Sequence, residues 1–201
     1  MKVLVIVDAQ NDFMPGGALA VPEGDKIIPV INKIIPEFDL VIATQDWHPE
    51  HHISFANNHL GKKAFDTIKF GEIKQTLWPA HCIQNTLGAD FHKELNTQNI
   101  EAIFRKGTSP KIDSYSGFYD NAHLKSTGLA GYLKEKEAKE LYFCGLAADI
   151  CVSFTVKDAL KLGFTSYLIE DASRALQAEE FTAVKKEIEY MGGKIVQSED
   201  V

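Results

Sequence analysis

The chain has 201 residues, of which 45% are hydrophobic and 24% are charged, as expected of an ordinary globular domain with a buried core. The formal net charge of −7 argues against a nucleic-acid-binding protein, because phosphate binding requires clustered lysine and arginine side chains. The apolar runs are too short to span a bilayer and the N-terminus lacks the layout of a signal peptide, so we expect a cytoplasmic protein that does not bind membranes.

Six short apolar runs predict the strands of a sheet, and several of them are apolar at consecutive positions. Such runs are typical of parallel strands that are buried on both faces. In chain order they cover residues 2–7, 40–44, 100–105, 140–145, 165–170 and 194–197. Apolar residues at helical spacing predict helices within residues 27–35, 124–136, 152–160 and 181–191. This alternation indicates right-handed βαβ units and a layered α/β fold.

The segment 45–99 interrupts the alternation. It is too long for an ordinary connection, and it is rich in Trp, His, Pro and Gly. Long excursions in compact domains are usually functional or disordered, and the aromatic content of this one argues against disorder. Since the chain contains no linker, repeat or low-complexity tract, we expect one domain over residues 1–201 with a functional insertion at 45–99.

Polar and unusual residues follow four of the predicted strands. Asp8 follows the first strand and residues 44–48 follow the second, while residues 105–108 and 145–151 follow the next two. In open α/β sheets, binding sites form beyond the carboxyl ends of the strands. The positions of these residues therefore predict an enzyme with its active site at that edge of the sheet.

Cys151 is the candidate nucleophile. It lies in the first turn of a predicted helix, where free backbone N–H groups and the helix dipole favour an anion and lower a thiol pKa. Asp8 and Lys106 end two other strands, so a nucleophile, a base and an electrostatic partner can meet there. The alternatives are that Cys151 is a small buried apolar residue and that Asp8 and Lys106 form a structural ion pair.

The other two cysteines carry weaker signals. Cys144 lies within a predicted strand and is expected in the core, whereas Cys82 lies beside His81 and could be mistaken for the nucleophile, so it serves as a decoy to test. Three cysteines with no CxxC pair argue against a disulfide framework or a cysteine-rich zinc site.

A candidate metal site lies in the excursion. Asp46 and His48 are two residues apart in an expected extended segment, so their side chains point to one face. His81 is a candidate third ligand, and a set of two histidines and a carboxylate suits zinc, manganese or iron(II). His52 fits either as a fourth ligand or as a partner of a ligand. Idle surface positions are expected for the remaining histidines, His51, His59, His92 and His123.

The chain resembles the nicotinamidases (pyrazinamidases) of the isochorismatase-like cysteine hydrolases over nearly its whole length. The shared motifs are VDAQNDFMPGGALAVP (7–22), TQDWHPEHHISF (44–55), WPAHCIQNTLGADF (78–91), FRKGTSPKIDSYSGF (104–118) and CGLAADICVSFTVKDAL (144–160). The resemblance implies a three-layer α/β/α fold with a six-stranded parallel sheet and Rossmann-like topology. It also implies that the insertion at 45–99 carries a metal site.

The resemblance assigns a role to each candidate residue. It implies that Asp8, Lys106 and Cys151 form the catalytic triad. It implies the metal ligands Asp46, His48 and His81, with His52 at a position where some members have a further histidine ligand. The substrate-pocket walls (Phe13 and Trp78), the backbone N–H groups of an oxyanion hole (Ala147 and Cys151) and a cis peptide bond (Leu146–Ala147) are implied in the same way.

The implied activity is hydrolysis of nicotinamide to nicotinate and ammonia through a thioester, a step of NAD salvage, with pyrazinamide as a further substrate. It requires one divalent metal ion, with zinc first and manganese or iron as alternatives, and it is compatible with a homo-oligomer. A related hydrolase of N-carbamoyl compounds, ureides or isochorismate-like ethers is the main alternative. A non-catalytic binding module and a hydrolase that uses metal-bound water are two others.

Overall fold

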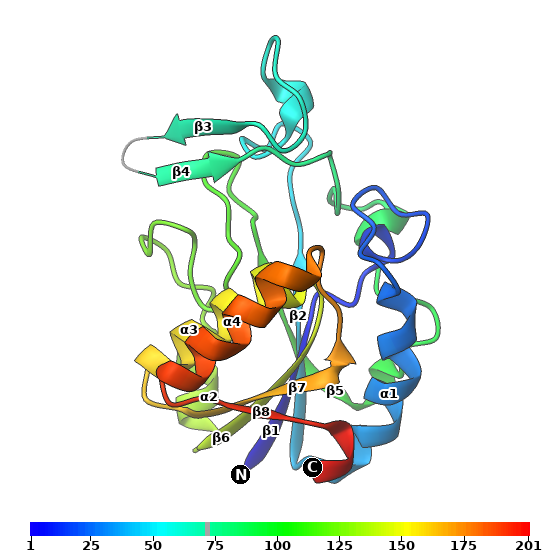
Figure 1. Cartoon of the computed structure of the whole chain (residues 1–201), viewed down its shortest axis with the longest axis vertical. Coiled ribbons are helices and arrows are strands. Elements are labelled where there is room, and N and C mark those ends of the chain that lie inside the picture. The colour runs from blue at the N-terminus through cyan, green and yellow to red at the C-terminus, as the bar shows by residue number, and fades with distance from the viewer. Residues whose placement is uncertain (71–72) are drawn as a thin grey trace.

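A computed structural model describes residues 1–70 and 73–201 and has a central sheet of six parallel strands (Figure 1). The strand order is β5-β2-β1-β6-β7-β8. The strands are β1 (Lys2–Val7), β2 (Leu40–Asp46), β5 (Ile100–Lys106), β6 (Glu140–Gly145), β7 (Thr165–Ser173) and β8 (Lys194–Val196). The sequence-based prediction of a six-stranded parallel sheet is confirmed, although β2 and β7 extend beyond their predicted ends.

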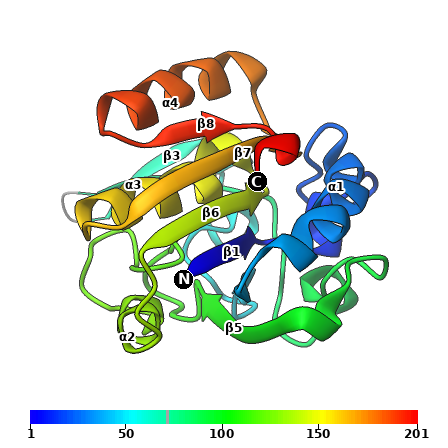
Figure 2. The ribbon, with the colours of Figure 1, turned by 90° about the horizontal axis from the view of Figure 1, so that it is seen from below.

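Helices cover both faces of the sheet and complete three layers. They are α1 (Ile27–Ile34), α2 (Leu129–Glu135), α3 (Ser153–Lys161) and α4 (Ala178–Tyr190). One core cluster packs α1 against the sheet, and a second packs α2, α3 and α4 against the other face. Figure 2 shows α1 and α3 on opposite sides of the strands. None of the helices in the described ranges is long and apolar enough to cross a membrane.

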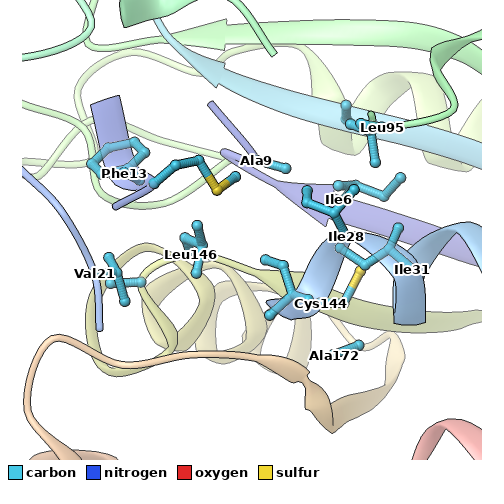
Figure 3. Packing of buried hydrophobic residues seen from close by; sticks show 14 of the residues in the cluster. Ile6, Ala9, Phe13, Val21, Ile28, Ile31, Leu95, Cys144, Leu146 and Ala172 are labelled. Carbon is cyan, nitrogen blue, oxygen red and sulfur yellow. The ribbon is translucent and has the colours of Figure 1, made fainter. Parts of the chain in front are cut away.

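The core on the α1 side contains residues from distant parts of the chain (Figure 3). Ile6 of β1, Ile28 and Ile31 of α1 and Cys144 of β6 are all fully or almost fully buried. Cys144 is therefore a core residue, as expected. Because successive side chains of a strand point to opposite faces, the consecutive apolar residues of β1 supply both cores.

The helix predicted within residues 124–136 is shorter in the structure and begins at Leu129. Gly128 has a φ of 94°, a left-handed conformation that does not continue a right-handed helix. Upstream, the Asp120 carboxylate accepts hydrogen bonds from the backbone N–H groups of Leu124 and Lys125. These bonds hold the preceding residues in a loop.

The excursion contains an antiparallel hairpin, β3 (Thr67–Phe70) and β4 (Ile73–Thr76), that forms a sheet of its own. Figure 1 shows this hairpin beyond the carboxyl ends of the central strands. The Ala56 N–H donates a hydrogen bond to the Trp78 carbonyl oxygen, and the Trp78 N–H donates one to the Ser54 carbonyl oxygen. These bonds join the segments on the two sides of the hairpin. The excursion therefore lies over the edge of the sheet at which the sequence predicts the active site.

Gly145→Ala is expected to destabilise the fold. Gly145 ends β6 beside Val7 with a φ of 121°, and a Cβ atom there would lie 2.0 Å from the Val7 carbonyl oxygen. We expect the free energy of unfolding to fall by about 2–3 kcal/mol, measured by urea denaturation. Gly131→Ala is the matched control, because Gly131 is exposed within α2 and has open space around it, and it should stabilise by about 0.5–1 kcal/mol. Equal urea midpoints for the two variants would contradict this expectation.

Candidate active site

Lys106 is the centre of a buried polar cluster at the carboxyl ends of the strands. It ends β5, and its ammonium Nζ lies 2.8 Å from Asp8 Oδ2 and 3.4 Å from Cys151 Sγ. The same ammonium donates to Asp46 Oδ1 at 2.5 Å and to the Ser114 carbonyl oxygen at 3.1 Å. The structure thus brings together the three residues of the expected triad and links them to one expected metal ligand.

Asp8 is a buried carboxylate whose two oxygen atoms have different partners. It directly follows β1 with a φ of 49°, a left-handed conformation that residues other than glycine rarely adopt. Its Oδ1 accepts a 2.6 Å hydrogen bond from the Thr44 hydroxyl, whereas Oδ2 is paired with the Lys106 ammonium at 2.8 Å. Burial raises the pKa of Asp8 to about 6, and the Lys106 ammonium opposes this rise. A pKa of about 6 suits a group that takes up and returns a proton near neutral pH.

The pKa of the Cys151 thiol is raised, whereas the sequence analysis expects it to be lowered. Cys151 lies in a π-helical turn, Ala148–Val152, which precedes α3. Burial raises the pKa of the thiol well above its ordinary value, and the Lys106 ammonium opposes this without reversing it. The expected lowering of the thiol pKa at the helix start is therefore wrong, because desolvation outweighs the favourable N–H groups. One oxygen of Asp8 and Cys151 Sγ lie within 4.8 Å of each other, so a base is close to the protonated thiol.

Cys82 is not poised for catalysis. It is fully buried, and its backbone N–H donates a 2.7 Å hydrogen bond to Asp12 Oδ2. Burial raises the pKa of its thiol well above the ordinary value, and the nearest carboxylates, Asp46 and Asp12, add to this rise. Unlike Cys151, Cys82 does not line the cavity described below.

Asp46, His48 and His81 form a buried group whose ligand atoms lie within 4.8 Å of one another. Asp46 Oδ2 is 3.6 Å from His48 Nε2 and 3.9 Å from His81 Nε2. The Nδ1 atoms of the two histidines lie 3.0 Å and 2.8 Å from the carbonyl oxygens of Gly107 and Pro79. Because carbonyl oxygens only accept, both Nδ1 atoms carry the hydrogen and both Nε2 lone pairs face the carboxylate. This arrangement fits a divalent metal ion.

The backbone around these ligands is held by residues that the sequence analysis did not single out. The Gln10 side chain accepts from the Asp46 N–H and donates to the Asp46 carbonyl oxygen, both at 2.8 Å. The His48 N–H donates to the Cys82 carbonyl oxygen, so the segment after His81 pairs with the segment after β2. Gly107 is required beside His48, because a Cβ at Gly107 would lie 2.2 Å from the His48 ring. In the sequence, the signal that could have identified Gln10 is its position two residues after Asp8.

His52 lies beside His48 and outside the group formed by Asp46, His48 and His81. The ring centroids of His48 and His52 are 4.3 Å apart. The ring nitrogens of His52 lie 2.7 Å from Ser54 Oγ and 3.3 Å from the Ile112 carbonyl oxygen. His48, His52 and Asp113 form a second group of ligand atoms within 4.8 Å. Neither group contains any of the other histidines, His51, His59, His92 or His123.

A small cavity joins the metal-ligand group to Cys151. Phe13 and Trp78 line it, as does Ala147, whose peptide bond with Leu146 is cis. The other lining residues are Leu19, Asp46, His48, His81, Asp113, Tyr115, Ile150, Cys151 and Leu176. Aromatic and aliphatic walls with a few polar groups are typical of a site for a small, flat ligand.

Tyr115 is a pocket residue that the sequence analysis did not identify. Its hydroxyl accepts hydrogen bonds from Trp78 Nε1 at 3.2 Å and from Gln75 Nε2 at 3.1 Å. Gln75 belongs to β4 and also donates to Asp113 Oδ2, so the hairpin is bonded to the pocket wall. A tyrosine in a loop carries no periodic signal, which is why only the structure places it here.

Comparison with known proteins agrees with this fold. The Isochorismatase domain family matches residues 2–200. A nicotinamidase of Acinetobacter baylyi is 51% identical over 173 residues, which are 86% of this chain and 81% of that protein.

Two solved structures are also similar. The nicotinamidase and pyrazinamidase of Acinetobacter baumanii superposes with a TM-score of 0.96 at 46% identity, covering 99% of this chain and 97% of that chain. The pyrazinamidase of Pyrococcus horikoshii in complex with zinc superposes with a TM-score of 0.81 at 42% identity, covering 98% of both chains. Sequence and structure together show that the chain belongs to the isochorismatase family and groups there with the nicotinamidases.

Proposed function

We propose that this chain is a metal-dependent cysteine amidohydrolase that converts nicotinamide to nicotinate and ammonia. The observation that carries the proposal is one cavity lined by Cys151, which contacts Lys106 and Asp8 behind it, and by the group formed by Asp46, His48 and His81. The nicotinamidases at 51% and 46% identity support the substrate. In this proposal the whole chain acts as one domain, and its segment 45–99 supplies the metal ligands.

The reaction begins with proton transfer. Because burial keeps the Cys151 thiol protonated, Asp8 Oδ2 takes its proton and Lys106 stabilises the thiolate. The thiolate attacks the carboxamide carbon and forms a tetrahedral intermediate. Its oxyanion accepts hydrogen bonds from the backbone N–H groups of Ala147 and Cys151. Asp8 then gives its proton to the amide nitrogen, the C–N bond breaks, and ammonia leaves a thioester on Cys151.

The second half of the reaction releases the acid. Asp8, again a carboxylate, takes a proton from a water molecule, and the hydroxide attacks the thioester carbon. The C–S bond breaks, nicotinate leaves, and the proton returns to the Cys151 sulfur. Nicotinate is a precursor for NAD salvage, and the same steps apply to pyrazinamide, whose ring is also a flat, nitrogen-containing six-membered ring.

Asp46, His48 and His81 would hold the metal ion, which we propose to be zinc. When bound, the ion supplies a Lewis acid for the ring nitrogen of the substrate and so orients the carboxamide. The walls formed by Phe13 and Trp78 hold the ring between aromatic faces. Zinc is supported by the donor set and by the zinc complex of the similar pyrazinamidase.

Ammonia release from nicotinamide by the purified protein tests this function. We expect release that stops after removal of the metal with a strong chelator and also stops after alkylation of the thiol. Zinc added back after chelation should restore release, and metal analysis checks that the site was emptied. Release that persists in metal-free protein would contradict the metal dependence. No release from metal-loaded protein would contradict the substrate and favour an N-carbamoyl compound or a ureide.

A further inference from the structure

Thr44 is a buried polar residue beside the catalytic cluster, and no role is assigned to it above. It lies in β2, and the parallel register pairs it with Val7, the last residue of β1. This register places the Thr44 side chain next to Asp8, which follows Val7. The two side chains are fully buried, and Thr44 Oγ1 donates a 2.6 Å hydrogen bond to Asp8 Oδ1.

The Lys106 ammonium is shared among four acceptors. An ammonium group has three N–H donors. The structure records three hydrogen bonds from Lys106 Nζ, to Asp46 Oδ1, the Ser114 carbonyl oxygen and Cys151 Sγ. A fourth acceptor, Asp8 Oδ2, lies 2.8 Å from the same nitrogen, so Asp8 shares this ammonium with three competitors. The Thr44 hydroxyl therefore gives Asp8 a hydrogen bond that does not depend on this shared ammonium.

We propose that Thr44 is a positioning residue that determines which oxygen of Asp8 acts as the base. Its hydroxyl occupies Oδ1, so Oδ2 remains as the acceptor for the thiol proton. Without this bond, the carboxylate can rotate about its Cβ–Cγ bond, and Oδ2 loses its fixed position beside the Lys106 ammonium. This inference rests on the roles proposed above for Asp8 and Cys151.

The two groups on the Cβ of Thr44 have separate contacts. The hydroxyl bonds to Asp8, whereas the methyl Cγ2 packs near Gly117, where an added Cβ would lie 2.7 Å from it. A purely structural role for Thr44 would depend on the methyl packing as well as on the hydroxyl. Substitutions that remove one group at a time therefore separate positioning from packing.

Four proteins form the test: the wild type, Thr44→Val, Thr44→Ser and Thr44→Ala. Valine has a methyl group in place of the threonine hydroxyl, and alanine lacks the hydroxyl of serine. The hydroxyl is therefore removed twice, once with the Cγ2 methyl present and once without it. We expect each removal to lower kcat by roughly 10- to 100-fold, since it deletes a hydrogen bond to a charged group. KM for nicotinamide and bound zinc should stay unchanged, and Thr44→Ser should retain most of the wild-type kcat.

The rate of alkylation of Cys151 by iodoacetamide is the second readout, because it needs the base but no substrate. We expect it to fall in Thr44→Val and Thr44→Ala and to be retained in Thr44→Ser. Equal kcat and alkylation rates within each pair would overturn the proposal, as would a Thr44→Ser protein as impaired as Thr44→Ala. If the valine variant does not fold, the serine and alanine pair decides. An inactive wild type whose alkylation follows the expected pattern would overturn the substrate but leave the role of Thr44 intact.

Discussion

Cys151→Ala is expected to lower kcat for nicotinamide hydrolysis by about 10⁴-fold or more, while metal content and nicotinamide binding survive. The sulfur is the atom that would bond to the substrate carbon, so no other side chain replaces it. It lies 3.4 Å from Lys106 Nζ, but Cys151 is not part of the group formed by Asp46, His48 and His81. Ammonia release, metal analysis and calorimetric titration with nicotinamide measure the three quantities separately.

Cys82→Ala is the matched control for this variant. Cys82 is also buried and lies next to a metal-ligand candidate, but its thiol does not line the cavity. We expect its turnover to stay close to that of the wild type. An active Cys151→Ala with an inactive Cys82→Ala would move the nucleophile to Cys82. Loss of nicotinamide binding together with turnover in Cys151→Ala would contradict the separation of binding from chemistry.

His81→Ala is expected to lose the metal and to raise KM sharply. Loss of an outer hydrogen-bond partner of a ligand lowers metal affinity by roughly 10- to 100-fold. Loss of the ligand itself costs more, so we expect metal affinity to fall by more than about 100-fold. The His81 ring is held in place by its 2.8 Å contact with the Pro79 carbonyl oxygen, and its Nε2 faces Asp46. Zinc retained after dialysis against a competing chelator measures the loss, and thermal unfolding of metal-free protein checks the fold.

His51→Ala is the control, because His51 is exposed in the same segment. It should keep both its zinc and its KM. A zinc-free His51→Ala beside an unaffected His81→Ala would reverse the choice of ligands. His52→Ala adds a finer comparison, since His52 lies beside His48 and outside the ligand group. Zinc loss in this variant as large as in His81→Ala would make His52 a ligand.

Much of the fold could be predicted because parallel strands buried on both faces leave an unbroken apolar run in the sequence. The residues at strand ends could be predicted for a related reason: the carboxyl ends of these strands meet at one edge. That rule nominated Asp8, Lys106 and Cys151 before any resemblance was used, and the structure brings their side chains together.

Other features depend on contacts that the sequence does not encode locally. The bond from Thr44 to Asp8 follows from the register of β1 against β2, which periodicity does not reveal. The raised pKa of the Cys151 thiol depends on how completely other segments bury it, so local helix geometry pointed in the wrong direction. Tyr115 enters the pocket from a loop, and only its tertiary hydrogen bonds reveal this position.

The order of the strands determines when the side chains around Lys106 can come together during folding. Asp8, Asp46, Lys106 and Cys151 lie at or just beyond the ends of four strands that are adjacent in the sheet, β1, β2, β5 and β6. Contacts between residues so distant in sequence form slowly, since long loops must close before the contacts stabilise them. During synthesis Cys151 emerges after Asp8, Asp46 and Lys106, so the thiol is the last of the four groups to appear. The four side chains can therefore meet only when these four strands have paired.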